Sequence, residues 1–158
     1  LEYRPNRGVF VSTPDMACIT DIYRIRKLIE CQAIASAWQG HPAVNAMRQA
    51  VEEALFCQQQ QDWDGMATAN MAFHLAIVEL ADSERLSKFY RHISAELRLA
   101  FGLLKDAQGL HVPYMDMNIK LLNLVEANNT AEAAQMLKAY LDQSERALLA
   151  YFSRRDSR

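Results

Sequence analysis

The chain has 158 residues, of which 51% are hydrophobic and 23% are charged. This balance excludes a disordered chain, and the length suffices for one domain with a substantial core. The formal net charge of −2 shows no basic excess, so we expect no direct contact with nucleic acid. No apolar run is long enough to cross a bilayer. Three cysteines without CxxC spacing predict free thiols, which are typical of the reducing cytoplasm.

The first twelve residues differ in character from the rest. Residues 4–8, Arg-Pro-Asn-Arg-Gly, have the composition of a turn, and residues 9–11 form a short strand-like run. Nothing else in the chain resembles a strand, and a single strand is not stable alone. We therefore expect this run to pair with a segment that precedes Leu1. The chain divides into residues 1–12 and a single domain over residues 13–158.

Beyond this segment, apolar residues recur with the helical period and predict six helices. Pro42 suits the first turn of a helix, Asp62 is a candidate N-cap, and Gly109 is expected to end the fourth helix. Short connections favour antiparallel neighbours, so the predicted fold class is an all-α bundle. The expected helices are 16–38, 42–60, 63–82, 84–107, 112–128 and 130–154.

Arg26 is the most informative residue of the first predicted helix. It shares one helical face with Ile22, Ile29 and Ala33, so a guanidinium lies within an apolar stripe. Burying this charge is costly without an anionic partner. Two interpretations carry equal weight. Glu30, one turn further on, pairs with Arg26 inside the protein, or Arg26 receives the carboxylate or phosphate of a ligand.

Polar groups also interrupt the apolar faces of three other helices. Asn70 and His74 are one turn apart in the third helix, Asn118 lies in the fifth, and Tyr140 lies in the sixth. Buried groups of this kind need hydrogen-bond partners. Each is interpreted either as a satisfied core residue or as part of a polar cavity on which several helices converge.

Four segments together resemble the FadR/FCD branch of the GntR-type transcription regulators. Residues 21–30 resemble the opening helix of FCD domains, with its Asp-Leu-Tyr-x-Leu-Arg-x-x-Leu-Glu pattern, and residues 70–74 resemble its Asp-x-x-Phe-His. Residues 118–141 resemble the closing His-x-x-Ile…Gly-Asp…His-Leu pattern. Residues 7–11 resemble the end of the GntR winged-helix domain, so residues 1–12 are interpreted as a remnant of that domain and its linker.

The resemblance implies an antiparallel bundle of six to seven helices around a central effector pocket. It further implies a cytoplasmic homodimer whose missing N-terminal domain binds DNA and whose DNA affinity changes on binding a small anionic metabolite, either an organic acid or an acyl-CoA. We expect no contact with membranes. The predicted effector-binding residues are Arg26, Asn70, His74, Asn118 and Tyr140.

This chain departs from the family at the metal-binding positions. Many FCD domains hold a metal with one Asp and three His, and these ligands fall on Asn70, His74, Asn118 and Tyr140. One imidazole with two amides and a phenol binds zinc or nickel poorly, so we predict no metal and no other cofactor. Asp116 lies two residues before Asn118, a spacing that turns it toward another face.

Two alternatives to a ligand sensor follow from the same sequence. A helical bundle also serves as a dimerisation or adaptor module that binds no ligand. A metal-dependent enzyme is disfavoured because the sequence offers neither a convincing metal site nor an acid–base pair. The prediction is therefore a non-enzymatic sensor domain.

Overall fold

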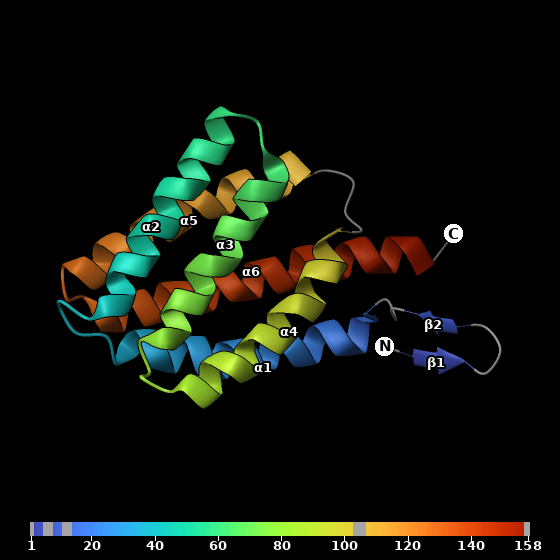
Figure 1. Ribbon diagram of the computed structural model, residues 1–158, viewed down its shortest axis with the longest axis horizontal. Helices are drawn as coiled ribbons and strands as arrows, with labels where there is room; N and C mark the ends of the chain where they lie inside the picture. The colour runs from blue at the N-terminus through green and yellow to red at the C-terminus, as the bar shows by residue number, and fades with distance from the viewer. Residues whose placement is uncertain (1, 5–7, 11–13, 103–106, 157–158) are drawn as a thin grey trace.

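In a computed structural model of the protein, residues 2–4, 8–10, 14–102 and 107–156 are described, and side-chain environments are described for 14–102 and 112–154. Six helices account for most of these residues, as Figure 1 shows. They are α1 (Met16–Ala35), α2 (Pro42–Gln59), α3 (Trp63–Glu79), α4 (Glu84–Gly102), α5 (Ala107–Glu126) and α6 (Thr130–Asp156). The predicted all-α bundle is confirmed.

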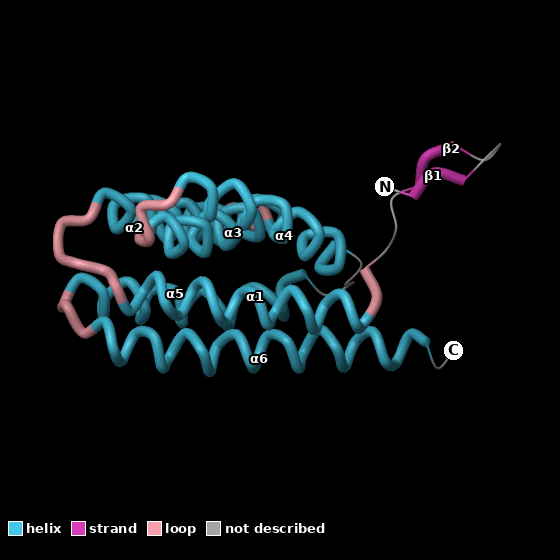
Figure 2. The backbone as a smooth tube through the Cα atoms, turned by 90° about the horizontal axis from the view of Figure 1, so that it is seen from below, coloured by secondary structure: helices cyan, strands magenta, loops and turns pink. Residues whose placement is uncertain are grey.

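The helices form two layers. Figure 2 shows α2, α3 and α4 on one side of the molecule and α1, α5 and α6 on the other. Within the layers, α2 packs along α3 and α1 packs along α6, while α3 also contacts α1 and α5. The inward-facing side chains of α1 and α3 therefore meet between the two layers. Inward-facing side chains of α5 and α6 lie there too.

The N-terminal strand pairs within the chain, which corrects one expectation. β2 (Gly8–Phe10) pairs antiparallel with β1 (Glu2–Arg4), with Tyr3 opposite Val9. An upstream partner is therefore not needed to explain the strand. β1 was not predicted because Glu-Tyr-Arg has no alternation of apolar and polar residues. Val11, the last residue of the predicted strand, lies outside the described residues.

Local chemistry explains most helix boundaries. The side chain of Asp62 accepts from the backbone N–H of Gly65 at 2.9 Å, and Pro42 occupies the first turn of α2, both as predicted. His41 caps α2, because its Nδ1 accepts from the N–H of Ala43 at 3.0 Å. The expected stop at Gly109 is wrong, since that residue lies within α5.

Pro113 also lies inside α5. A proline there lacks the N–H that would bond to the carbonyl of Gly109, so the helix continues past it without one backbone bond. The described part of α4 ends at Gly102, and residues 103–106 of the longer predicted helix lie outside the described residues.

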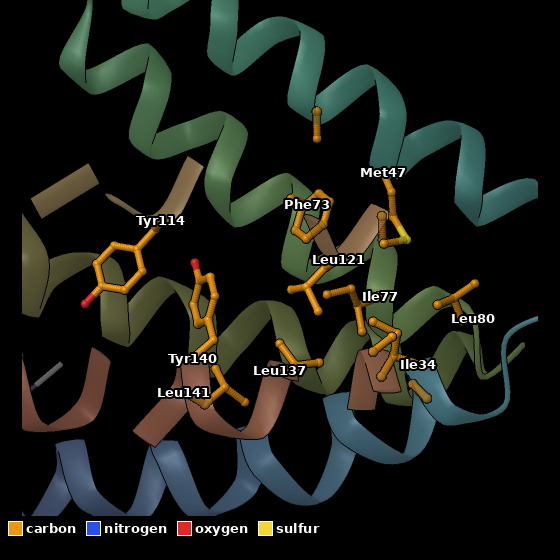
Figure 3. Packing of buried hydrophobic residues seen from close by; sticks show 14 of the residues in the cluster. Ile34, Met47, Phe73, Ile77, Leu80, Tyr114, Leu121, Leu137, Tyr140 and Leu141 are labelled. Carbon is orange, nitrogen blue, oxygen red and sulfur yellow. The ribbon is translucent and has the colours of Figure 1, made fainter. Parts of the chain in front are cut away.

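The main core lies between the two layers. Phe73 and Ile77 of α3 pack with Leu121 of α5 and with Leu137 and Leu141 of α6, and each of these side chains is at most 1% exposed. Figure 3 shows Tyr140 among them, with its hydroxyl pointing away from α6. Burial of such side chains contributes roughly 1.5–3 kcal/mol each. The polar groups described below are therefore held in a rigid apolar frame.

Over the described residues, no helix combines the length and the apolar character that crossing a membrane requires.

Candidate functional site

The five predicted effector-binding residues meet in one place. Arg26 comes from α1, Asn70 and His74 from α3, Asn118 from α5 and Tyr140 from α6. Four of them are at most 4% exposed, and Asn70 is partly buried. A continuous series of hydrogen bonds, with Glu30 as a further member, connects all five. The polar groups therefore converge, while the polar cavity that the sequence left open stays a prediction.

Arg26 and Glu30 form a buried ion pair along α1. The Arg26 Nε donates to Glu30 Oε1 over 2.7 Å, and the side chains are 5% and 0% exposed. The hydroxyl of Tyr90, from α4, donates to the same carboxylate oxygen over 2.5 Å. The Arg26 guanidinium carbon also lies 5.1 Å from the centre of the Tyr23 ring, a cation–π contact. The internal pairing that the sequence allowed is therefore present.

His74 connects this pair to the opposite side of the cluster. Its Nδ1 lies 2.6 Å from Glu30 Oε2, and its Nε2 lies 2.9 Å from the Tyr140 hydroxyl. A carboxylate only accepts, so Nδ1 carries the hydrogen and neutral His74 accepts at Nε2. A phenol has one hydrogen, so Tyr140 donates it to Nε2.

The two amides complete the cluster. Asn118 Nδ2 donates to Asn70 Oδ1 over 2.7 Å, and the Tyr140 hydroxyl lies 3.3 Å from the same oxygen. Tyr114, also from α5, places its ring 5.0 Å from that of Tyr140. Residues 70, 74, 118 and 140, onto which the resemblance places the family's metal ligands, are therefore neighbours in space.

The charges of the cluster cancel. Burial alone would raise the pKa of Glu30, but the Arg26 guanidinium and the bonds from His74 and Tyr90 outweigh it and hold this pKa at about 2. Burial lowers the pKa of His74, against the opposing effect of Glu30. At neutral pH the cluster therefore holds one cation, one anion and an uncharged imidazole.

Two groups at opposite ends of the cluster keep unused bonding capacity. Both Nη nitrogens of Arg26 lack a hydrogen-bond partner among the described residues, and the side chain as a whole is 5% exposed. Asn118 Oδ1 is fully enclosed and also has no partner among these residues. A guanidinium fork binds carboxylate or phosphate well, and an amide oxygen accepts from N–H or O–H groups. Each end of the cluster therefore has capacity for a further hydrogen-bonding partner.

Several members of the cluster were not predicted from the sequence. Tyr90 lies on the buried face of α4, spaced by three residues from both Ser87 and Ile93, so the argument applied to Tyr140 applies to it equally. Tyr23 and Ser144 form a second buried pair, with their hydroxyl oxygens 2.6 Å apart. Tyr23 was not predicted because a tyrosine on an apolar stripe is most often a packing residue, and Ser144 gave no signal in the sequence.

The residues present do not fit the family's metal. Two neutral amides and a phenol whose pKa is raised by burial surround a single imidazole. Asp116 does not supply a carboxylate, because its side chain is exposed while Asn118 is buried. Among the described side chains, no group of three or more His, Cys, Asp and Glu has the geometry of a metal site. The absence of a metal in the native protein stays a prediction.

Other hollows lie outside this cluster. One runs between α1 and the α3–α4 turn and is lined by Leu28, Trp38 and Leu86, and others lie at the α1–α2 turn and between α2 and α3. None of them includes a predicted effector-binding residue. The central pocket stays a prediction, because none of these hollows reaches Arg26, whose side chain is 5% exposed.

The structure is a two-layered helical bundle with a buried, charge-balanced polar cluster between the layers. The FCD domain family matches residues 21–143, and the chain belongs to this family. FCD domains are parts of transcription regulators and not enzymes, as the sequence predicted. Among curated proteins, none matches this chain significantly.

Solved structures agree with this assignment. A protein described as a GntR transcriptional regulator from Rhodococcus sp. RHA1 is 33% identical, with a TM-score of 0.88 over 92% of this chain and 70% of that chain. Lar, described as controlling expression of the Listeria monocytogenes agr system, is 13% identical, with a TM-score of 0.73 over 97% of this chain and 72% of that one. The metal-free FCD domain of the regulator TM0439 is 14% identical, with a TM-score of 0.64 over 88% of this chain and 96% of that chain. The last two show the fold alone.

Proposed function

We propose that this FCD domain senses a small anionic metabolite, which binds at the buried cluster and changes the DNA affinity of a winged-helix domain joined to its N-terminus. The observation that carries the proposal is the convergence of Arg26, Asn70, His74, Asn118 and Tyr140 from four helices. The two Arg26 Nη nitrogens, which have no hydrogen-bond partner among the described residues, support a role for the cluster in ligand binding. The carboxylate of an organic acid can accept two hydrogen bonds from the Arg26 guanidinium. The phosphates of an acyl-CoA are the alternative acceptors.

The proposed mechanism is linkage between two sites. An effector that binds one arrangement of paired domains more tightly than another shifts the population toward it. On this proposal, the molecule acts in the cytoplasm as a homodimer. Residues 1–12, which include the β1–β2 hairpin, are the end of the winged-helix domain and its linker. This division at residue 13 is supported by the contrast between the hairpin and the helical bundle.

Thermal unfolding with a panel of organic acids and acyl-CoA tests the proposal. Saturation at 100 times Kd stabilises a folded protein by about 2.7 kcal/mol, so a ligand gives a clear rise in Tm. The double variant Arg26→Gln/Glu30→Gln removes both buried charges without leaving one unpaired, and it is expected to abolish the rise. Arg91→Gln, which alters an exposed arginine, is the matched control. No shift with any acid or acyl-CoA in the well-folded native protein would remove the sensor proposal.

An adaptor module without a ligand is the second candidate. It is supported by the Arg26–Glu30 pair, because this pair already neutralises the buried guanidinium. On this hypothesis, the double variant folds and dimerises like the native protein, and no small acid changes the Tm of either. The same titration therefore separates the two functions.

A further inference from the structure

Tyr90, in the middle of α4, is in direct contact with the buried ion pair of α1. Its hydroxyl donates to Glu30 Oε1 over 2.5 Å and accepts from Arg26 Nε, which lies 3.3 Å away. These three side chains are at most 4% exposed. Burial raises the pKa of Tyr90 well above its usual range, so the hydroxyl keeps its hydrogen. The position of α4 is therefore joined to the state of the ion pair.

The other polar contacts between α4 and its neighbours are exposed. Cys18 Sγ of α1 lies 3.6 Å from a carboxylate oxygen of Glu96, and Arg91 lies 3.3 Å from Glu79 of α3. Among the described residues, every buried side-chain hydrogen bond between α4 and another helix thus involves Tyr90. A buried bond to a carboxylate is stronger than an exposed contact of this kind.

The apolar contacts of α4 fall into two groups. Leu97 and Ala100, toward its C-terminal end, belong to the main core. Tyr90 and Ile93 instead form a small separate cluster with Val78 of α3. Residues 84–93 therefore have less core packing than the rest of the helix, and their attachment depends more on the hydrogen bond of Tyr90.

The outer side of the same segment faces solvent. Arg85, Lys88, Phe89 and His92 are exposed, and the Phe89 side chain remains 47% exposed. These residues share a short stretch of helix with Tyr90. A change in the attachment of Tyr90 inside the protein therefore also changes an aromatic and basic part of its surface.

We infer that Tyr90 couples the buried cluster to α4. Its hydrogen bond to Glu30 holds residues 84–93 against α1, and a ligand that draws Arg26 or Glu30 into new hydrogen bonds loosens this segment. The second half rests on the proposed sensor function, whereas the first half is a property of the ligand-free protein. Tyr90 acts here as a positioning residue and need not touch the ligand.

Hydrogen exchange of the backbone amides tests the first half. Losing a buried hydrogen bond to a charged group changes an opening equilibrium by a factor of about 10 to 100. Tyr90→Phe should therefore accelerate exchange in residues 84–93 by about tenfold or more and leave α2 unchanged. Tyr23→Phe is the matched control, because its buried hydroxyl pairs with Ser144 of α6 over 2.6 Å. It should alter exchange in residues 84–93 by no more than about twofold.

A second background tests whether the hydroxyl acts through the carboxylate. In the Arg26→Gln/Glu30→Gln variant the charged acceptor is gone, so adding Tyr90→Phe should accelerate exchange in residues 84–93 several-fold less than in the native protein. An equally large acceleration in both backgrounds would show that Tyr90 holds α4 independently of Glu30. A uniform acceleration over α2 and α4, or none in residues 84–93, would make Tyr90 an ordinary core residue and the inference wrong.

The ligand half has its own readout. An organic acid or acyl-CoA that raises the Tm of the native protein should also accelerate exchange in residues 84–93 relative to α2. If such a ligand raises the Tm and exchange in this segment stays the same or slows, the coupling is wrong while the sensor function stands. If no such ligand raises the Tm, the sensor function and the ligand half fail together, and the Tyr90→Phe result still decides the first half.

Discussion

His74 Nδ1 donates to Glu30 Oε2 over 2.6 Å, so a histidine of α3 completes the bonding of a carboxylate on α1. The other carboxylate oxygen already accepts from Arg26 and Tyr90. Three helices thus share one buried anion. Its protonation state and that of His74 affect both the stability of the bundle and the polarity of the proposed site.

Acid is expected to destabilise the domain in two steps. The folded-state pKa of His74 is below its usual 6.5, so the unfolded chain takes up a proton first and stability falls as the pH drops below about 6.5. The folded-state pKa of Glu30 is about 2 against 4.5, so a further loss develops between these values. From this difference, Glu30 contributes on the order of 3 kcal/mol above pH 4.5. Urea unfolding at pH 7, 5.5, 4 and 3 measures the slope.

The Glu30→Gln variant separates the two steps. It removes the titration between pH 4.5 and 2 at this position and should give a shallower slope there than the native protein. Exposed carboxylates contribute equally to both proteins. A native slope that is unchanged in Glu30→Gln over this range would contradict the assignment of a depressed pKa to Glu30.

Arg26 is expected to be costly to replace alone. Arg26→Gln leaves Glu30 buried without its main counter-charge, and breaking a buried pair in this way costs about 3–5 kcal/mol. Arg91→Gln breaks an exposed pair with Glu79 and should change the free energy of unfolding by at most about 1 kcal/mol. Chemical unfolding of both variants gives the comparison.

A second substitution tests whether the unpaired charge causes the loss. Adding Glu30→Gln to Arg26→Gln removes the stranded carboxylate and should restore part of the stability. The cost of Glu30→Gln is measured twice, once in the native protein and once in the Arg26→Gln variant. If Glu30→Gln lowered the free energy of unfolding equally in both, the two residues would be energetically independent.

Local sequence signals accounted for the fold but not for the contacts of the site. Asp62 and Pro42 act within one turn of chain, so the starts of α2 and α3 were predictable. The helix end predicted at Gly109 was wrong. Glycine followed by a nearby proline usually ends a helix, whereas α5 continues through Pro113.

The site required tertiary information. Periodicity placed Asn118 and Tyr140 on inward faces, but the rotation of α5 and α6 about their axes decides whether they meet Asn70. Their family correspondence indicated that they do, and the hydrogen bonds agree. Tyr90 gave no such indication because a tyrosine on an apolar stripe is most often a packing residue.

Gly65 is predicted to resist substitution although it lies in a helix. Replacing helical glycine with alanine usually stabilises by roughly 0.5–1 kcal/mol. A Cβ at Gly65 would overlap Asp62 Oδ2 and lie 2.7 Å from Cys57 Sγ, and Asp62 is the N-cap of α3. Gly65→Ala should therefore destabilise by about 1–2 kcal/mol through the lost cap and the displaced thiol.

Gly102 supplies the matched control for this prediction. A Cβ there meets nothing within 4 Å, and the residue is exposed at the end of α4. Gly102→Ala should change stability by between zero and about 1 kcal/mol in the favourable direction. Equal effects of the two substitutions on thermal unfolding would show that the crowding around Gly65 relaxes without cost.

Restoring the family's ligands is expected to create a metal site. Asn70→Asp, Asn118→His and Tyr140→His would add a carboxylate and two imidazoles around His74 Nε2, while Glu30 continues to orient the His74 ring through Nδ1. Three pairs of these side chains are already joined by polar atoms 2.7–3.3 Å apart, so the introduced ligands start from one shared cluster. Addition of Zn²⁺ or Ni²⁺ should raise the Tm of the triple variant.

The native protein is the control for the metal-induced change in Tm. Two amides and a phenol bind such ions weakly, so the same metal should leave the native Tm unchanged, whereas a metal present at 1,000 times its Kd stabilises by about 4 kcal/mol. The triple variant with His74→Gln added keeps a polar side chain but loses one imidazole, and its Tm response should be much smaller. A folded triple variant that bound no metal would show that the side chains of α3, α5 and α6 converge less closely than these hydrogen bonds require.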